Sequence, residues 1–244
     1  MSSNCREEYY DPISKVAVTI VDAQSAAETL IANHLSGPAA GYFLSEGLAA
    51  VALLGAEMSE PEECVSLQLK CKGPLGGMNV ECTSGGTLRG YTEKKILDDF
   101  DDLEKFDQKK IMGEKQIQVT RTVPGRIISQ GIATNLTGYL NQSLQRNAVI
   151  KLEGYRGILV EALPDSEIKD LAPRLREIKS LNVASRNILK KLGFMKAELK
   201  KSTELKFACR CSKERAKEMA AALGEKGKLD IVCHMCGKLY TVVI

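Results

Sequence analysis

The sequence predicts an α+β protein in three parts: an N-terminal domain with a largely antiparallel sheet and packed helices, a helical linker, and a small cysteine-rich C-terminal domain. Short period-two stretches and turn clusters dominate the first 165 of the 244 residues. After Pro164 the apolar spacing becomes helical, and four of the eight cysteines lie beyond residue 208. We therefore expect domain boundaries that give 1–165, 166–203 and 204–244.

The first elements predicted are a strand and two helices. Residues 16–21 form an apolar run typical of a strand, and residues 25–34 have helical spacing. Pro38 can open a helix because the first helical turn does not use its missing N–H. The stretch that follows, AAGYFLSEGLAAVALLGAEM, is apolar on most sides, which predicts a buried core helix.

An antiparallel meander is predicted next. Residues 65–71 and 78–82 alternate apolar and polar side chains, and TLRGY (87–91) follows a second turn cluster. Cys71 and Cys82 fall in the inward phase of these strands, with Cys64 opposite to Cys71. We expect Cys71 and Cys82 to be inert core thiols.

The rest of the N-terminal domain is predicted as insertion, strands, helix and hairpin. Residues 93–115 are charged and are expected to form a surface insertion, followed by extended structure on both sides of the Pro124-Gly125 turn. Residues 134–146 have helical spacing, and residues 148–163 carry a strong hairpin pattern. This domain is long enough to bury a core of its own.

The segment between the two domains is basic. Residues 169–217 carry 15 Lys/Arg and 5 Asp/Glu, whereas residues 1–168 carry 16 and 23. Apolar residues recur at helical spacing in two runs, which predicts an amphipathic helix pair that ends at Gly193. Such charge asymmetry can mark contact with nucleic acid, or it can be a solvated helix face.

The N-terminus carries no targeting pattern. MSSNCREEYYDPISK is polar and acidic, without the basic start and apolar middle of a secretory signal. No apolar run is expected to approach the roughly 18 residues of a membrane helix. We therefore expect a cytoplasmic protein without a membrane partner.

The tail contains the sharpest pattern in the chain. Cys209-x-Cys211 is followed after 21 residues by Cys233-x-x-Cys236, and Ser212 can cap the helix between the pairs. Four thiolates suit tetrahedral zinc, and so small a unit can hardly fold on core burial alone. We predict one zinc ion held by Cys209, Cys211, Cys233 and Cys236, with His234 outside the ligand set.

The same ligands allow a second kind of chemistry. Nearby cations and a metal keep sulfurs as thiolates, and oxidants attack thiolates. Oxidised sulfur no longer holds zinc, so the fold that depends on the metal would fail. The short-loop pairings are Cys209 with Cys211 and Cys233 with Cys236, but spacing alone does not separate an inert site from a redox switch.

Two blocks of sequence resemble one known family. The tail motifs FACRCSKER and CHMCGKLY occur together with VSLQLKCKGPLGGMNVECTSGGTLRGY in the first domain. In combination they resemble the redox-regulated heat-shock chaperones of thirty-three kilodaltons, which are zinc-binding holdases activated by oxidation. The resemblance is strongest at residues 65–91 and 207–240.

The resemblance implies a function that is not enzymatic. The reduced, zinc-bound protein would be inactive, and oxidants would convert the four tail cysteines to two disulfides and release zinc. The tail and linker would then unfold and uncover apolar surface for unfolding client proteins, without ATP, as part of the stress response. The oxidised form would dimerise, with substrate binding and dimerisation assigned to the N-terminal domain.

Two other functions remain as alternatives. A nucleic-acid-binding protein would use the zinc unit and the basic linker, but the tail offers only Phe207 and Tyr240 for base stacking. We therefore rank nucleic acid below protein clients. A thiol–disulfide oxidoreductase would use Cys233-x-x-Cys236, which lacks the βαβ context of such enzymes. With only His34 and His234, histidine-based catalysis is not expected.

Overall fold

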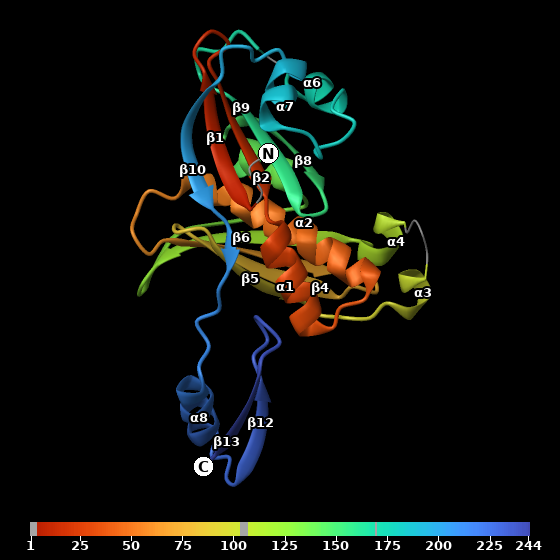
Figure 1. Cartoon of the computed structure of the whole chain (residues 1–244), viewed down its shortest axis with the longest axis vertical. Helices are drawn as coiled ribbons and strands as arrows, with labels where there is room; N and C mark the ends of the chain where they lie inside the picture. Colours follow the sequence, from red (N-terminus) through yellow and green to blue (C-terminus); the bar gives the residue numbers. More distant parts are fainter. Residues whose placement is uncertain (1–3, 103–106, 169) are drawn as a thin grey trace.

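Two sheets and a short hairpin contain the strands of the described residues. The computed structural model describes residues 4–102, 107–168 and 170–244 (Figure 1). The first sheet has the strand order β10-β1-β2-β9-β8 and is antiparallel throughout. Its strands are β1 (Cys5–Asp11), β2 (Val16–Asp22), β8 (Asn147–Glu153), β9 (Arg156–Ala162) and β10 (Glu198–Glu204).

The second sheet contains the predicted meander. Its order is β11-β5-β4-β3-β6-β7, and only the short contact of β11 with β5 is parallel. Its strands are β3 (Cys64–Cys71), β4 (Gly77–Thr83), β5 (Thr87–Thr92), β6 (Lys115–Val123), β7 (Arg126–Ala133) and β11 (Lys206–Phe207). The expected α+β class and the largely antiparallel pairing are confirmed.

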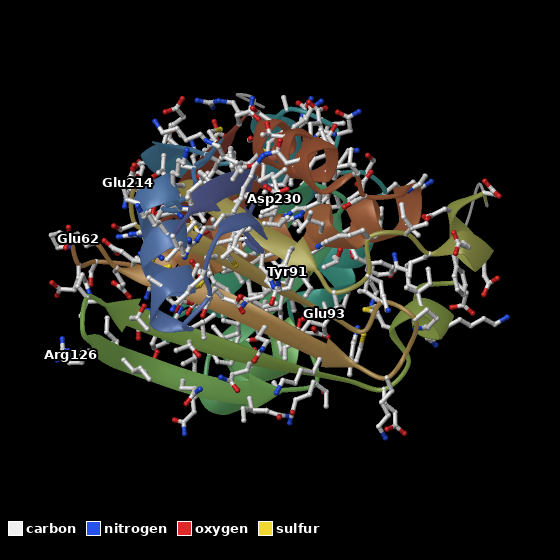
Figure 2. The ribbon with its side chains drawn as sticks, turned by 90° about the horizontal axis from the view of Figure 1, so that it is seen from below. Glu62, Tyr91, Glu93, Arg126, Glu214 and Asp230 are labelled. Carbon is white, nitrogen blue, oxygen red and sulfur yellow. The ribbon has the colours of Figure 1, made fainter. Side chains whose placement is uncertain are left out.

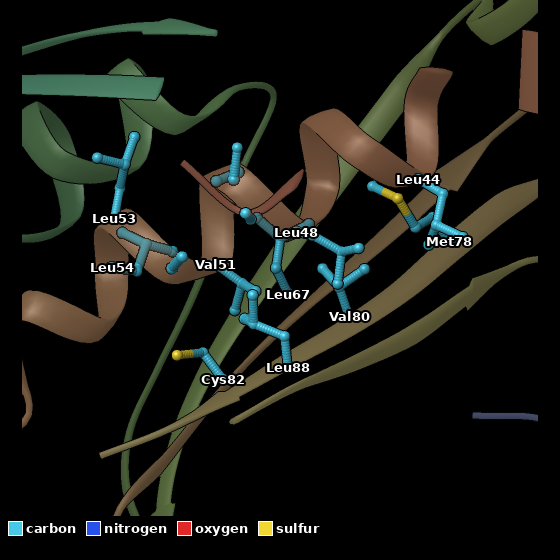
Figure 3. Packing of buried hydrophobic residues seen from close by; sticks show 14 of the residues in the cluster. Leu44, Leu48, Val51, Leu53, Leu54, Leu67, Met78, Val80, Cys82 and Leu88 are labelled. Atoms are coloured by element: carbon cyan, nitrogen blue, oxygen red, sulfur yellow. The ribbon is translucent and has the colours of Figure 1, made fainter. Parts of the chain in front are cut away.

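The core lies around one central helix, as its all-round apolar sequence predicts. Helix α2 (Pro38–Leu54) begins at Pro38 and buries 14 of its 17 residues between the two sheets, with α1 (Gln24–His34) beside it. Figure 3 shows Leu44, Leu48 and Val51 of this helix among side chains of β3, β4 and β5. A Cβ at Gly47 would lie 2.4 Å from the sulfur of Met78, so glycine permits this close packing.

The cysteines of the first domain lie where alternation places them. Cys82 is fully buried in this core and Cys71 packs against its edge, whereas Cys64 lies on the opposite phase of β3. Burial raises the pKa of the Cys82 thiol to about 12, so it stays protonated. These observations confirm the expectation of a core thiol for Cys82, whereas Cys71 is half-buried at the edge of the core.

One expectation about membrane helices is wrong. The helical stretch Pro38–Glu57 is long and apolar enough to cross a membrane, although no run of that length was expected. In the folded chain 83% of its most apolar window is buried inside the protein. Core packing between two sheets explains its composition.

The predicted linker helices are present but short. They are α6 (Ala172–Arg176) and α7 (Ser185–Lys191), and both pack on the face of the first sheet that points away from α2. Leu175, Leu189 and Phe194 are buried there against Val18 and Val160. The linker region therefore covers an apolar sheet face.

Strands β1 and β10 are the two strands of the first sheet that the sequence did not predict. β10 lies in the expected linker segment and pairs with β1 at the edge of the first sheet. Both strands are rich in charged residues and do not alternate, because neither has one face against the core and the other in solvent. The division into three domains remains a prediction.

Two other segments differ in detail from the expectation. The charged insertion forms α3 (Asp98–Asp101) and α4 (Gln108–Met112), and part of it, residues 103–106, lies outside the described residues. The helix expected over 134–146 consists of α5 (Leu136–Gly138) and one π-helical turn, η2 (Tyr139–Ser143). A 3₁₀ turn, η1 (Gly55–Glu57), extends α2.

Candidate metal centre

The cysteine-rich tail folds into one helix against one hairpin. Helix α8 (Lys213–Ala222) follows the first cysteine pair, and the hairpin consists of β12 (Lys228–Val232) and β13 (Leu239–Val243). The Ser212 hydroxyl accepts a hydrogen bond from the main-chain N–H of Arg215, as its predicted capping role requires. The loop between β12 and β13 carries Cys233 and Cys236.

The four predicted ligands converge on one point. All four Sγ atoms lie within 4.8 Å of one another, and they form the sole cluster of three or more metal-binding side chains found in residues 4–102, 107–168 and 170–244. The Sγ–Sγ distance is 3.8 Å between Cys209 and Cys233 and 3.5 Å between Cys211 and Cys236. These are distances between free thiols, far above the roughly 2.05 Å of a disulfide.

This spacing fits a tetrahedral thiolate site. A zinc ion with Zn–S bonds of about 2.3 Å places its four sulfurs about 3.8 Å apart. The donor set is all sulfur, which favours zinc over harder ions. Three of the cysteines are half-buried and Cys236 is buried, so the site is close to the surface but shielded on one side.

A glycine makes the second cysteine loop possible. Gly237 has a φ of +72°, and its main-chain N–H donates to the carbonyl oxygen of Cys233, which closes the loop that carries Cys233 and Cys236. A Cβ at this position would lie 2.3 Å from the carbonyl oxygen of Asn33 in α1. The loop therefore packs directly on the first domain.

The pKa values of the thiols are not equal. Burial opposes ionisation of Cys209, but hydrogen bonds from Cys211 and Arg89 outweigh it and lower the pKa of Cys209 to about 7. Burial raises the pKa of Cys233 and of Cys236. Cys209 is thus the thiol of these three that ionises most readily.

Strand β5 is the surface on which the tail docks. Arg89 of β5 forms a salt bridge with Glu81, at 2.6 Å, and donates to Cys209 Sγ at 3.8 Å. Glu81 also pairs with Arg210, the residue between the first two ligands, at 3.2 Å. The main-chain N–H of Gly90 donates to Met235 in the second loop. From below, the tail lies in front of the second sheet, where Figure 2 labels Tyr91.

Neither histidine belongs to the four-cysteine cluster. His34 Nε2 lies 2.9 Å from the carbonyl oxygen of Gly90 and therefore donates to it. Burial lowers the pKa of His34, which keeps the ring neutral in this contact. The ring of His234 packs edge-on against Tyr91, with 5.8 Å between the centroids. The His234 ring thus contacts the first domain from the tail, whereas the His34 contact joins α1 to β5 within the first domain.

The two aromatic residues of the tail are already engaged. Tyr240 is 9% exposed, and its hydroxyl lies 3.1 Å from Cys211 Sγ. Phe207 belongs to β11 and packs against the core of the first domain. A groove of about 270 Å³ beside them opens toward Cys209, Cys211 and Cys236. These rings serve the site and its docking, which leaves neither free for base stacking.

The sequence did not reveal the side chains around the ligands. Arg89, Glu81 and Tyr240 contact the site or its neighbours, yet Arg89 and Glu81 are separated from the tail by more than a hundred residues. The alternation of residues 87–91 indicated only that Arg89 leaves the core face. No local pattern pairs it with a cysteine.

Comparison with known protein families gives one match. The family model described as Hsp33 protein matches residues 10–243. A 33 kDa chaperonin of Thermus thermophilus is 26% identical, over 91% of this chain and 79% of that protein. A 33 kDa chaperonin of Symbiobacterium thermophilum is also 26% identical, over 85% and 83% of the two chains.

A solved structure confirms the arrangement of the elements. The crystal structure of a 33 kDa chaperonin from Thermotoga maritima superposes with a TM-score of 0.82. The match covers 98% of this chain and 94% of the other, at 19% sequence identity. At this identity the likeness shows a shared fold.

Proposed function

Because the chain belongs to the Hsp33 family, we propose that it is a redox-regulated, ATP-independent holdase that binds unfolding proteins and prevents their aggregation under oxidative stress. Its relatives are named chaperonins and not enzymes, which supports a chaperone function. The regulation, the metal and the client surface are the parts that we propose.

One observation carries the proposal. The peptide segment that enters the four-cysteine site is the same segment that covers an apolar sheet face. Going back from Cys209, the chain forms β11 on β5, β10 on β1, and then α7 and α6 on the first sheet. If the tail unfolded, α6 and α7 would thus lose an attachment that helps to hold them against the apolar face of the first sheet.

In the reduced form, Cys209, Cys211, Cys233 and Cys236 would hold one zinc ion. When bound, zinc keeps the four sulfurs as thiolates and supplies most of the folding free energy of the tail. The apolar cluster of the tail supports this dependence, because its buried members are only Ala216, Tyr240 and Val242.

Oxidation would act on the sulfurs. A thiol, reacting as its thiolate and returning its proton to the hydroxide that leaves, reduces peroxide and gives a sulfenic acid and water. A second thiol then condenses with the sulfenic acid, which forms a disulfide and releases a second water. Two thiols and one peroxide thus give one disulfide and two waters. Cys209, Cys211 and Cys233 are only half-buried, and a groove opens beside Cys209 and Cys211, so we propose that the reaction begins at one of the half-buried sulfurs.

We propose the pairs Cys209–Cys211 and Cys233–Cys236 for the two disulfides. All four sulfurs lie within 4.8 Å, so the folded site is compatible with more than one pairing. Once the tail loosens, short loops cost less closure entropy than loops of more than twenty residues. Disulfide mapping of the oxidised protein checks this pairing.

Activation would uncover the sheet face beneath α6 and α7. That face contributes Val16, Val18, Ile20, Ile158 and Val160 to a buried cluster, and the linker covers it with leucines, isoleucines and Phe194. Exposed apolar surface of this kind binds unfolding chains through hydrophobic burial. We place the client surface there, on the N-terminal domain, and we propose a cytoplasmic protein that dimerises when oxidised.

The test follows client aggregation and zinc together. Light scattering of a heat-aggregating client is recorded with the protein before and after peroxide, while a chromogenic chelator reports released zinc. We expect suppression of aggregation to rise in step with zinc release. Complete zinc loss without any gain in suppression would contradict the proposal.

A matched variant separates the tail thiols from the others. Cys71→Ser removes a half-buried cysteine outside the four-sulfur cluster. This variant should switch as the parent does, whereas Cys236→Ser should bind zinc poorly and lose the zinc-coupled response.

A further inference from the structure

A basic groove lies between α7 and the start of β10, away from the cysteines. It has a volume of about 700 Å³ and is lined by Tyr9 of β1, the outer side of α7 and residues 194–199. Met195 and Leu199 in its wall are 66% and 52% exposed. The groove is therefore partly apolar although it opens to solvent.

The charged groups of the groove are unbalanced. Arg186, Lys190 and Lys196 line it, and within the described residues none of these three side chains has an ion-pair or hydrogen-bond partner. The carboxylate of Glu198 is already paired with Lys200. Three uncompensated cations thus face the same space, which favours an anionic ligand.

The groove continues into an open sheet edge. β10 pairs with β1 on one side, and in the part of the chain that the structure describes no strand pairs with its other side. Figure 1 shows β10 at the outer edge of the first sheet. An open edge offers unpaired main-chain N–H and C=O groups to an extended polypeptide.

We propose that this groove and the edge of β10 bind an extended, acidic segment of another polypeptide that also carries apolar residues. The main chain of the segment would pair with β10, its carboxylates would lie near Arg186, Lys190 and Lys196, and its apolar side chains would contact Met195 and Leu199. The site exists in the folded, reduced protein, so it goes beyond the oxidation-dependent function proposed above.

Nucleic acid fits the groove less well. Single-stranded nucleic acid binds to aromatic platforms on which bases stack. The rings near the groove are Phe194, which is 1% exposed, and Tyr9, whose hydroxyl is bonded to Glu7. Exposed aliphatic side chains next to cations suit an acidic and apolar peptide better.

The test is fluorescence anisotropy of a labelled peptide of ten residues in which Glu and Val alternate, titrated with reduced, zinc-loaded protein. We expect saturable binding with a Kd below about 100 µM that weakens as salt is added. The same peptide with Gln in place of Glu, and one with N-methyl groups at alternate amides, should bind at least about tenfold more weakly.

A charge-reversal pair tests the location. Arg186→Glu with Lys196→Glu should raise the Kd by about tenfold or more, because two of the three cations are reversed. Glu at position 186 also suits the first turn of α7, so the fold should persist, as zinc content and circular dichroism would verify. The matched control is Lys109→Glu with Lys110→Glu in α4, which reverses two exposed lysines outside the groove.

Three results would overturn the inference. These are no saturable binding up to about 0.5 mM protein, equal binding by the groove and control variants, and tighter binding of a ten-nucleotide oligothymidine that the groove variant abolishes. The last result would assign the groove to nucleic acid. None of them depends on suppression of client aggregation, so the inference can fail while the proposed holdase function stands.

Discussion

The first domain and the cysteine-rich tail differ in the interactions that stabilise each of them internally. Helix α2 buries 14 of 17 residues between two sheets, whereas helix α8 buries only Ala216 and Ala220 and leaves Met219 and Leu223 more than half exposed. The tail has four converging sulfurs in place of a core. The comparison teaches that one chain can combine a region with a large apolar core and a region with a small apolar cluster, whose fold we propose depends on a metal ion.

Removal of the metal should separate the two regions most strongly. Structural zinc contributes about 10–16 kcal/mol to the folding of small zinc units near neutral pH. We expect a strong chelator under reducing conditions to unfold residues 205–244 and leave the first domain folded. Limited proteolysis measures this, and a tail that remains resistant to protease after zinc loss would show that it folds without the metal.

A truncation in the core should destabilise the first domain and leave the tail unchanged, which is the reverse of the effect of metal removal. Leu48→Ala removes a fully buried side chain from α2 and should lower the free energy of unfolding of the first domain by about 2–5 kcal/mol. Zinc affinity should not change. Denaturant unfolding and a zinc competition assay measure the two effects, with the volume-conserving Leu48→Met as control.

Acid should weaken the two regions in different pH ranges. Metal ligands must be deprotonated, so zinc affinity should fall as the pH drops below 7. In the first domain, burial opposes ionisation of Glu63, but hydrogen bonds from Arg121 outweigh it and lower the pKa of Glu63 below 4.5. Its stabilising effect is therefore present above about pH 4.5 and is lost as the pH falls through the lower folded value.

Circular dichroism and zinc release, followed from pH 8 to pH 3, test this order. Zinc should leave while the first domain is still folded. The variant Glu63→Gln should lose the pH dependence due to this carboxyl, and unfolding of the first domain before zinc release would contradict the prediction.

The smallest effect is expected at the cap of α8. Ser212→Ala removes the side-chain acceptor for the N–H of Arg215 and should destabilise the helix by about 1 kcal/mol. Because the metal dominates the tail, zinc affinity should fall only severalfold. Zinc competition measures the change, and Ser212→Asp, which keeps an acceptor, should restore the parent affinity.

The sequence predicted the parts of this molecule that follow local rules. Helix α2, the meander of β3 to β5 and the four clustered cysteines each have a spacing or period that physical rules interpret. Strands β1 and β10 were not predicted because apolar and polar side chains do not alternate along these charged strands. The role of Arg89 was not predicted because Arg89 and Cys209 lie 120 residues apart in the sequence, and no local pattern indicates their contact.

We propose above all that the four-cysteine site, with its metal, holds α6 and α7 in place against the apolar face of the first sheet. Hydrogen–deuterium exchange with mass spectrometry tests it most directly, on reduced protein and on protein from which peroxide has released the zinc. We predict that exchange rises in residues 170–207 together with the tail, while α2 stays protected. Full exchange of the tail with α6, α7 and β10 still protected would contradict the claim.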